Sequence, residues 1–434
     1  MSAQTLLLKE VLRRDVQPAL GCTEPVAVAL ACSVAAQAAR TSEVIAKGSP
    51  IEHVSIVVDP GVMKNGNAVA VPNSFGKKGN LIAAALGTVC THPELGLELL
   101  QGTDAQALAS AEHLLRSNMI SLVYDENQTS LYIRATVTIG ANTAIAVIKD
   151  THTNIASITL NGVRLDSQVT GQTAREESTL DGRLSSLSIT DLVQIANKAD
   201  KDDICYLLSG ADMNSALSTA GMSLQKVGHH LETMLLSRTI DDGPINRAKI
   251  AVAAATDARM AGIALPAMSS GGSGNQGIVA ILVPYLMGKY SNVPDTQIGK
   301  SLALSHLVNS YVKCFTGKLS SMCGCAVAAG VGASSAIVLQ ENGDALVVGN
   351  AINNVLANIA GVLCDGAKGG CALKVASSAE TAIMSANLAL GGYSLGGPEG
   401  IIGKTADETI ANLGKLATSS DPVVNQEVLS ILGR

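Results

Sequence analysis

The spacing of apolar residues predicts two helices at the start of the chain. Apolar residues recur with a helical period over residues 4–15. After a proline-bounded break, residues 26–39 are almost wholly apolar, with Thr23 as the expected N-cap and Pro25 in the first turn. Because a helix that is apolar on all sides lies in a core, we expect the second helix to be buried.

From residue 52 the hydrophobic period changes to two, which predicts strands. The alternation marks residues 54–58, 68–71, 131–139, 143–149 and 155–160. A helix capped by Thr103 is expected over residues 103–117. Region 50–163 is therefore predicted to be an α+β domain with an antiparallel sheet.

The rest of the chain is predicted to be helical. We expect Thr190 to cap a helix over residues 191–198, and Pro244 to open one over residues 245–261. The predicted organisation is residues 1–49, N-terminal helices packing on the C-terminal domain; 50–163, the α+β domain; 164–187, a polar surface connection; and 188–434, a helical, Gly-rich domain. The fold class is therefore α+β, with a largely helical catalytic domain beside the antiparallel-sheet domain.

Composition removes several classes of protein. The 434 residues are 47% apolar and 15% charged, which excludes a disordered chain and suggests two to three domains. A net charge of -6 and only 2% aromatic residues argue against a nucleic-acid partner.

Two segments, residues 260–288 and 319–340, are long enough to span a bilayer and contain no charged residue. Both are rich in Gly, Ser, Asn and Gln, which transfer poorly into lipid. We therefore expect buried segments of a globular protein and no membrane partner. The N-terminus shows no pattern of a secretory signal, so we expect a cytoplasmic protein. Whether the protein forms a homo-oligomer stays open.

The cysteines are unevenly distributed. Nine in a chain of this length are too few for a disulfide framework, so grouped cysteines indicate metal binding or catalysis. Cys314 and four others fall between residues 314 and 371, and glycines surround the four, which are Cys323, Cys325, Cys364 and Cys371. A metal or iron–sulfur site and a set of packed small thiols both explain them, whereas the spacing matches no zinc ribbon.

A second feature is the glycine-rich segment 269–277, which precedes an apolar helix. Residues 272–277 formally satisfy G-x-G-x-x-G, but no βαβ unit surrounds them, so a dinucleotide site is not expected. A nest of backbone amides at a helix N-terminus suits an anion such as a carboxylate. A tight turn between helices is the alternative.

Two isolated side chains are candidates for catalysis. Cys22 precedes the helix over residues 26–39, whose dipole is expected to lower the thiol pKa, and this makes it a candidate thiolate base or nucleophile. A buried thiol at a helix start is the alternative. His152 lies at a strand end and could donate to a ligand, whereas no lysine has a convincing pyridoxal-phosphate setting.

Four motifs in order resemble one known family. They are Gly21-Cys-Thr-Glu-Pro25, Asp59-Pro-Gly-Val-Met-Lys-Asn-Gly66, Ser270-Gly-Gly-Ser-Gly-Asn-Gln-Gly277 and Cys323-Gly-Cys-Ala-Val-Ala-Ala-Gly330. From about Leu6 onward the chain resembles the L-cysteine desulfidase family, which is related to the α-chain of iron–sulfur L-serine dehydratases. The resemblance implies a [4Fe–4S] lyase without pyridoxal phosphate that converts a small amino acid, L-cysteine, to pyruvate, ammonia and sulfide.

The resemblance also implies roles for individual residues. The cluster ligands would be Cys323 (or Cys325), Cys364 and Cys371, and Cys22 would be the base, with His152 the next candidate. The carboxylate would be held by Ser270, Gly271, Gly272, Ser273, Gly274, Asn275 and Gln276. Three alternatives stay open: L-serine dehydration by the same mechanism, a non-catalytic redox- or iron-responsive protein, and a structural zinc protein.

Overall fold

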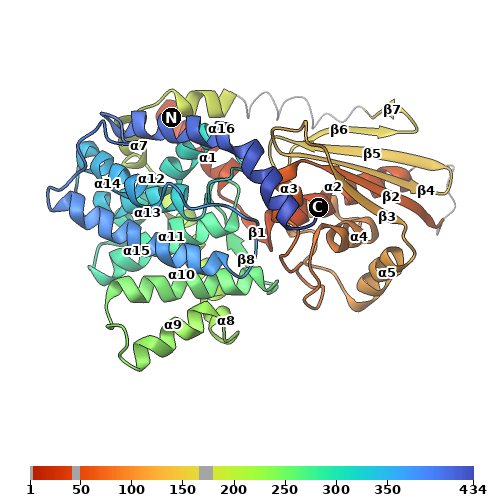
Figure 1. Ribbon diagram of the computed structural model, residues 1–434, viewed down its shortest axis with the longest axis horizontal. Coiled ribbons are helices and arrows are strands. Elements are labelled where there is room, and N and C mark those ends of the chain that lie inside the picture. The colour runs from red at the N-terminus through yellow and green to blue at the C-terminus, as the bar shows by residue number, and fades with distance from the viewer. Residues whose placement is uncertain (1–2, 42–48, 166–178) are drawn as a thin grey trace.

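The protein has a sheet-containing part and a helical part that lie side by side. The computed structural model describes residues 3–41, 49–165 and 179–434. The six-stranded sheet forms one end of the molecule and the helices the other (Figure 1), which confirms the predicted α+β class. In the described part of the chain, every helix is too short or too polar to span a bilayer.

The sheet is mixed, with strand order β3-β2-β4-β5-β6-β7. Its strands are β2 (Ile51–Val58), β3 (Ile120–Tyr124), β4 (Tyr132–Ile139), β5 (Asn142–Lys149), β6 (Ile155–Leu160) and β7 (Val163–Arg164). Strand β2 pairs antiparallel with β4 but parallel with β3. The prediction did not include β3, and its parallel pairing depends on the long crossover connection over residues 59–119.

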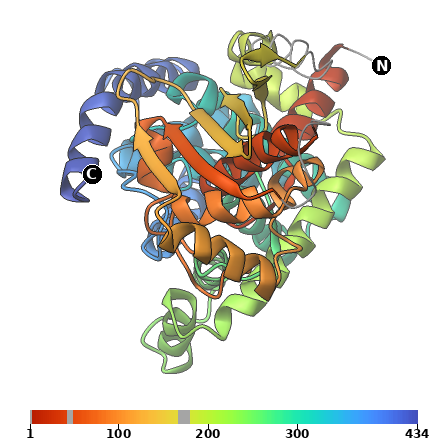
Figure 2. The same cartoon turned by 90° about the vertical axis from the view of Figure 1, so that its right-hand side faces the viewer.

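Helices cover one face of this sheet. Four of them are α2 (Thr23–Arg40), α3 (Pro60–Asn65), α4 (Asn80–Val89) and α5 (Ala105–Arg116), and a 3₁₀ helix η1 (Pro93–Glu98) follows α4. The long α2 packs against β4 and β5, whose inward residues are buried at every second position. In Figure 2, the sheet end faces the viewer and the other part lies behind the strands. The period-two alternation therefore corresponds to one buried and one more exposed face.

The helical part is built around α12 and α13. Its helices are α1 (Ala3–Asp15), α7 (Ile189–Ala196), α8 (Lys201–Met222), α9 (Val227–Leu236), α10 (Pro244–Met260), α11 (Gly274–Tyr290), α12 (Asp295–Thr316), α13 (Val327–Gln340), α14 (Ala345–Ile359), α15 (Cys371–Leu390) and α16 (Ala406–Ile431). Their shared core is mostly Ala, Val, Leu and Ile. Helix α1 joins it by packing on α12 and α7. Pro244 opens α10, as predicted.

Two contacts connect the parts. Strand β1 (Pro18–Leu20) pairs antiparallel with β8 (Pro266–Met268), which brings the segment before α2 beside the segment before α11. Helix α16 packs against α3, and its Leu429 is buried in the core beneath the sheet. The first contact lies next to the motifs at residues 21–25 and 270–277, and the second involves α3, which lies within the motif at residues 59–66.

Three predicted N-caps were wrong by one or two residues. Thr23, Thr103 and Thr190 were expected, but Cys22, Asp104 and Ser188 occupy these positions. The side chains of Asp104 and Ser188 each accept a hydrogen bond from a backbone N–H group. Asp and Ser are more favourable N-cap residues than Thr. Cys22 makes no side-chain capping bond.

The predicted strand at residues 68–71 was also wrong. Only an isolated bridge joins Ala70 to Lys78. Its apolar residues are buried, and Val69 belongs to a small buried cluster with Cys22 and Met260. Of the predicted connection 164–187, residues 166–178 lie outside the described residues, and the domain boundaries stay predictions.

Candidate active site

Two loops bring four cysteines together. Cys323 and Cys325 precede α13, whereas Cys364 lies in the connection from α14 to α15 and Cys371 is the first residue of α15. A short antiparallel bridge joins the loops: the Cys323 amide donates to the Val362 carbonyl (2.8 Å), and the Cys364 amide donates to the Ser321 carbonyl (2.6 Å). We call these four residues the four-thiol group. Backbone pairing therefore places Cys323 beside Cys364 although 40 residues separate them.

The four thiols influence one another electrostatically. A hydrogen bond from Cys325 lowers the pKa of Cys323, and the same contact raises the pKa of Cys325. Burial raises the pKa values of Cys364 and Cys371, and the charge of a neighbouring Cys323 thiolate raises both further. Such mutual repulsion means that the thiolates need a positive partner to ionise together.

Lysines supply part of this positive charge. Lys64 of α3 is buried, and its Nζ donates to the Cys364 carbonyl (2.9 Å) and to Asn425 Oδ1 of α16 (2.7 Å). Its charge lowers the pKa of Cys364, and that of Lys374 lowers the pKa of Cys323. Helix α3 thus delivers a cation to the four-thiol group.

The four-thiol group has the donor chemistry of an iron–sulfur cluster, because the ligands of such clusters are cysteine thiolates. Among the residues that the structure describes, no three Cys, His, Asp or Glu side chains are arranged closely enough to hold a metal ion. The backbone bridge therefore gathers the thiols without closing them into a coordination sphere. Cys314 is not in the group, since its Sγ contacts Asp181 Oδ1 at 3.6 Å.

Cys22 and His152 meet at Glu24. The Cys22 thiol donates to Glu24 Oε2 (2.9 Å), and Asn65 Nδ2 of α3 donates to Glu24 Oε1 (3.0 Å). His152 Nε2 lies 3.9 Å from Glu24 Oε1. The Cys364 thiol in turn lies 3.8 Å from Asn65 Oδ1. This Glu24 network links both predicted catalytic residues to the four-thiol group.

The pKa of Cys22 shifts opposite to the predicted direction. Burial raises it, and the Glu24 carboxylate beside it raises it further, so these effects outweigh the helix dipole. For Glu24, burial acts to raise the pKa, but the His152 ring and the hydrogen bonds from Cys22 and Asn65 lower it below its usual value. Burial lowers the pKa of His152. In the resting protein at neutral pH, Glu24 is therefore the anion and Cys22 holds its proton.

The glycine loop, residues 269–277, lies between β8 and α11. Gly271 and Gly272 adopt positive φ angles of 55° and 77°, which favour glycine. The N-cap Ser273 makes no side-chain capping bond. The first amides of α11 have no helical acceptor, because helix geometry leaves the first N–H groups unpaired. A helix N-terminus is therefore present where it was predicted, and its binding of an anion stays a prediction. The Ser270 hydroxyl is occupied by contacts to His306 and Asn309 at 2.8 Å.

This loop contacts the other two groups. A Cβ placed on Gly324 would lie 2.8 Å from Gln276 Nε2, so Gln276 reaches the turn between Cys323 and Cys325. A Cβ on Gly272 would lie 3.9 Å from His152 Nδ1. The glycine loop, the Glu24 network and the four-thiol group are therefore parts of one region.

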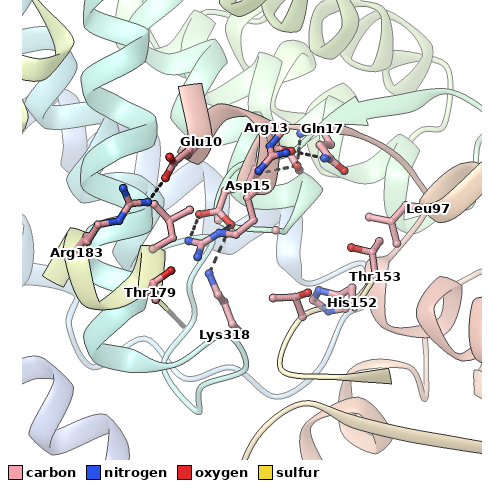
Figure 3. Close-up of a pocket in the computed structure, with 16 residues that line it drawn as sticks. Glu10, Arg13, Asp15, Gln17, Leu97, His152, Thr153, Thr179, Arg183 and Lys318 are labelled. Atoms are coloured by element: carbon pink, nitrogen blue, oxygen red, sulfur yellow. Dashed lines mark hydrogen bonds and ion pairs between the residues drawn. The ribbon is translucent and has the colours of Figure 1, made fainter. Parts of the chain in front are cut away.

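A cavity of about 650 Å³ adjoins this region. His152, Gly271 and Gly272 line one side, and Lys318 faces the same space (Figure 3). Arg14, which also lines it, donates to Asp15 at 2.9 and 2.7 Å. The cavity is large enough for a small amino acid and gives a polar approach to the glycine loop.

Sequence reasoning missed several residues of this site. Glu24 and Asn65 lie within quoted motifs but received no role, and Lys64 was equally overlooked. Their motif positions were the available signal. Arg259 is a charged residue in an otherwise mainly apolar segment of α10, and it is 2% exposed. Asp257, two residues before it, is also charged and buried, and two charges at the end of an apolar segment were the available signal.

Comparison with known proteins places the chain in a family. A UPF0597 protein of Geobacter sulfurreducens is 45% identical over 98% of this chain and 97% of its own length. UPF0597 proteins of Elusimicrobium minutum and Desulfatibacillum aliphaticivorans are 42% and 37% identical, each over 98% of this chain. The family model described as serine dehydratase alpha chain matches residues 94–430. Since this match covers more than half of the sequence, the chain belongs to the serine dehydratase alpha chain family.

Proposed function

We propose that this protein is an iron–sulfur-dependent lyase that converts L-cysteine to pyruvate, ammonia and sulfide by β-elimination. One observation carries the proposal: the four-thiol group lies beside the Glu24 network, which contains a thiol and a carboxylate suited to proton transfer. Family membership supports a lyase of the serine dehydratase kind. The motif at Cys22 supports the choice of L-cysteine.

Cys364, Cys371 and either Cys323 or Cys325 would hold a [4Fe–4S] cluster. With three protein ligands, such a cluster leaves one iron free to act as a Lewis acid toward the β-substituent of the substrate. Lys64 and Lys374 favour the thiolate forms that ligation requires. An oxygen-sensitive cluster and reduced thiols fit the cytoplasm.

The residues of the Glu24 network would move the Cα proton. Cys22 would act as the base once its thiol has passed its proton to Glu24 Oε2, 2.9 Å away. Because the pKa of Cys22 is raised and that of Glu24 is lowered, this transfer is uphill in the resting protein and belongs to the substrate-bound state. The thiolate would then accept the proton from Cα, and Glu24 would give its proton to the departing β-sulfur, which leaves as hydrogen sulfide. Loss of this proton and of the β-sulfur leaves aminoacrylate, which water hydrolyses to pyruvate and ammonia. The amides at the start of α11 would hold the carboxylate. His152, close to Glu24 and the glycine loop, would complete the polar wall.

L-serine dehydration by the same residues is the second candidate, because the matched family is described by serine dehydratase. A thiolate is a better leaving group than hydroxide, since its conjugate acid is much stronger. A pocket alone separates two substrates of such similar shape by only about 1–3 kcal/mol. Any preference should therefore appear in turnover more than in binding.

The test uses anaerobically purified protein. We expect iron, acid-labile sulfide, and pyruvate formation from L-cysteine with release of sulfide. Cys364→Ser and Cys371→Ser should lose iron, whereas Cys205→Ser, which changes an exposed thiol, should retain it.

Other outcomes separate the alternatives. Zinc without labile sulfide would indicate a structural zinc protein, and iron without turnover of either amino acid would indicate a regulatory protein. A higher kcat/KM for L-serine would assign the chain to the dehydratases. Full iron content in both cysteine variants would contradict the assigned ligands.

A further inference from the structure

Arg259 is a buried cation, and two of its three guanidinium nitrogens have no hydrogen-bond acceptor among the described residues. It is the next-to-last residue of α10, and its side chain is 2% exposed. Its Nη1 donates to Asn275 Oδ1 at 3.0 Å. Its Nε and Nη2 are enclosed and have no hydrogen-bond partner within the described ranges. Since an enclosed charge without a partner is costly, this pair of donors indicates a site for an anion.

The free edge of the guanidinium is the one that binds carboxylates. Nε–H and one Nη2–H point in parallel and match the two oxygens of a carboxylate. The same edge is used twice elsewhere in this protein. Arg14 contacts Asp15 through Nε (2.9 Å) and Nη2 (2.7 Å), and Arg247 contacts Asp242 through Nε (2.6 Å) and Nη2 (2.8 Å). At Arg259, none of the residues that the structure describes supplies the equivalent carboxylate.

This edge lies at the start of α11. A Cβ on Gly274, the first residue of the helix, would lie 2.3 Å from Arg259 Nε and 2.8 Å from Nη2. Only glycine therefore admits the guanidinium at this position. The unpaired amides of the first turn and the positive end of the helix dipole face the same neighbourhood. Two independent features, the free arginine edge and the helix N-terminus, thus converge on one place.

The surroundings of Arg259 differ from those of the lysines. Its positive charge acts on Cys22 and on His152, whereas Lys64 and Lys374 act on the four-thiol group. Glu24, the nearby carboxylate, is bonded to Cys22 and Asn65. Arg259 thus lies on the side of the site where the Cα proton would be removed.

We propose that Arg259 binds the α-carboxylate of the amino-acid substrate through Nε and Nη2, together with the first amides of α11. The inference rests on the proposed function and adds the residue that selects an α-amino acid over a neutral analogue. Because the charge of the guanidinium reaches Cys22, a carboxylate bound to Arg259 would hold Cα on the side of the site where that thiol lies. Asn275 holds the guanidinium in orientation through its bond to Nη1.

The test measures binding apart from turnover. Calorimetry on anaerobic, cluster-replete protein compares the binding of L-alanine with that of L-alaninamide. Neither ligand has a leaving group, and L-alaninamide has a neutral amide in place of the carboxylate. We expect wild-type protein to bind L-alanine about 10- to 100-fold more tightly, the effect of a charge-assisted hydrogen-bonded pair. Arg259→Lys keeps the charge but loses the bidentate edge, and it should weaken L-alanine binding and raise KM for L-cysteine by a similar factor. Arg247→Lys, at an exposed pair, should change neither.

Two results would overturn the inference. One is wild-type protein that fails to bind L-alanine or binds both ligands equally, which needs no variant to fold. The other is a folded Arg259→Lys protein that binds L-alanine as tightly as wild type. If the wild type forms no pyruvate but binds L-alanine through Arg259, the proposed function fails and the carboxylate site stands. If the wild type forms pyruvate while the Arg259→Lys protein binds L-alanine as tightly as wild type, the proposed function stands and the carboxylate site at Arg259 fails.

Discussion

Asp59 holds the helix that delivers two residues to the site. It is the N-cap of α3 and is 4% exposed. Its Oδ1 accepts the amides of Gly61 (2.7 Å) and Val62 (3.0 Å), and its Oδ2 accepts the amide of Tyr132 in β4 (2.8 Å). One carboxylate therefore starts α3 and fastens it to the sheet.

The cost of removing this carboxylate follows from its bonds. Losing an N-cap side chain costs about 0.5–2 kcal/mol. The Tyr132 amide, left without its acceptor, adds ~1–3 kcal/mol. Asp59→Ala should therefore lower the free energy of unfolding by about 1.5–5 kcal/mol. Because α3 carries Lys64 and Asn65, the variant should also retain less iron.

The pH dependence of this loss has a definite sign. Burial raises the pKa of Asp59 from 3.8 to about 6, against the lowering effect of its three backbone bonds. The folded state thus binds the Asp59 proton more tightly than the unfolded state. The resulting stability is fully present below pH 4 and is lost as pH rises toward 6. We expect the difference between wild type and Asp59→Ala to be larger at pH 4 than at pH 7.

Urea unfolding of both proteins, with Asp104→Ala as the control, tests this account. Asp104 is an exposed N-cap in the same part of the molecule and accepts one amide, that of Ala107, at 2.7 Å. Its replacement should cost about 1 kcal/mol and leave iron content unchanged. If Asp59→Ala costs no more than Asp104→Ala, the bond to β4 does not fasten α3, and the reasoning is refuted.

Two further changes probe the site. Glu24→Gln removes the group that accepts the Cys22 proton. This variant and Cys22→Ser should each lower the rate of Cα deuterium exchange about 10²–10⁴-fold while the iron content stays normal. Near-normal exchange in both variants would show that the base lies elsewhere. Gly277→Ala puts a Cβ 1.9 Å from the Met268 carbonyl, so it should cost about 1–3 kcal/mol in thermal or urea unfolding. Gly349→Ala, whose Cβ would meet only Ala406 Cβ at 3.5 Å, should be neutral or stabilising, and equal losses in both would reject the steric argument.

Local pattern predicted the elements whose stability is local. Alternation located β4 and β5 because one face of each is buried against α2. It also located β6, although all six residues of this strand are only half-buried. Strand β3 was missed since its five residues contain no fully buried position, so its alternation is weak. The caps were misplaced because threonine was chosen where a neighbouring Asp or Ser makes the stronger bond.

The site could be predicted only in pieces. Glycine-rich surroundings identified the cysteines, and the helix start identified the glycine loop. The contacts that join these pieces bridge distant positions, as when Asn65 reaches Glu24 or Lys64 reaches the Cys364 loop. No sequence period encodes such pairs. The direction of the Cys22 pKa shift was likewise unpredictable, because it depends on burial and on the placement of Glu24.

The balance of charge in the site connects cofactor, substrate and stability. Lys64 and Arg259 are buried cations, and Lys313, also buried, has its pKa lowered to about 8, chiefly by burial. Glu24 is the anion that faces Cys22 in this region. Thiolates bound to a cluster would compensate the lysines, and a substrate carboxylate would compensate Arg259. Both ligands then bind the folded state alone and must stabilise it, each raising the melting temperature with its concentration. The two increments should be separable, because L-alanine acts at Arg259 and iron loading acts at the four-thiol group.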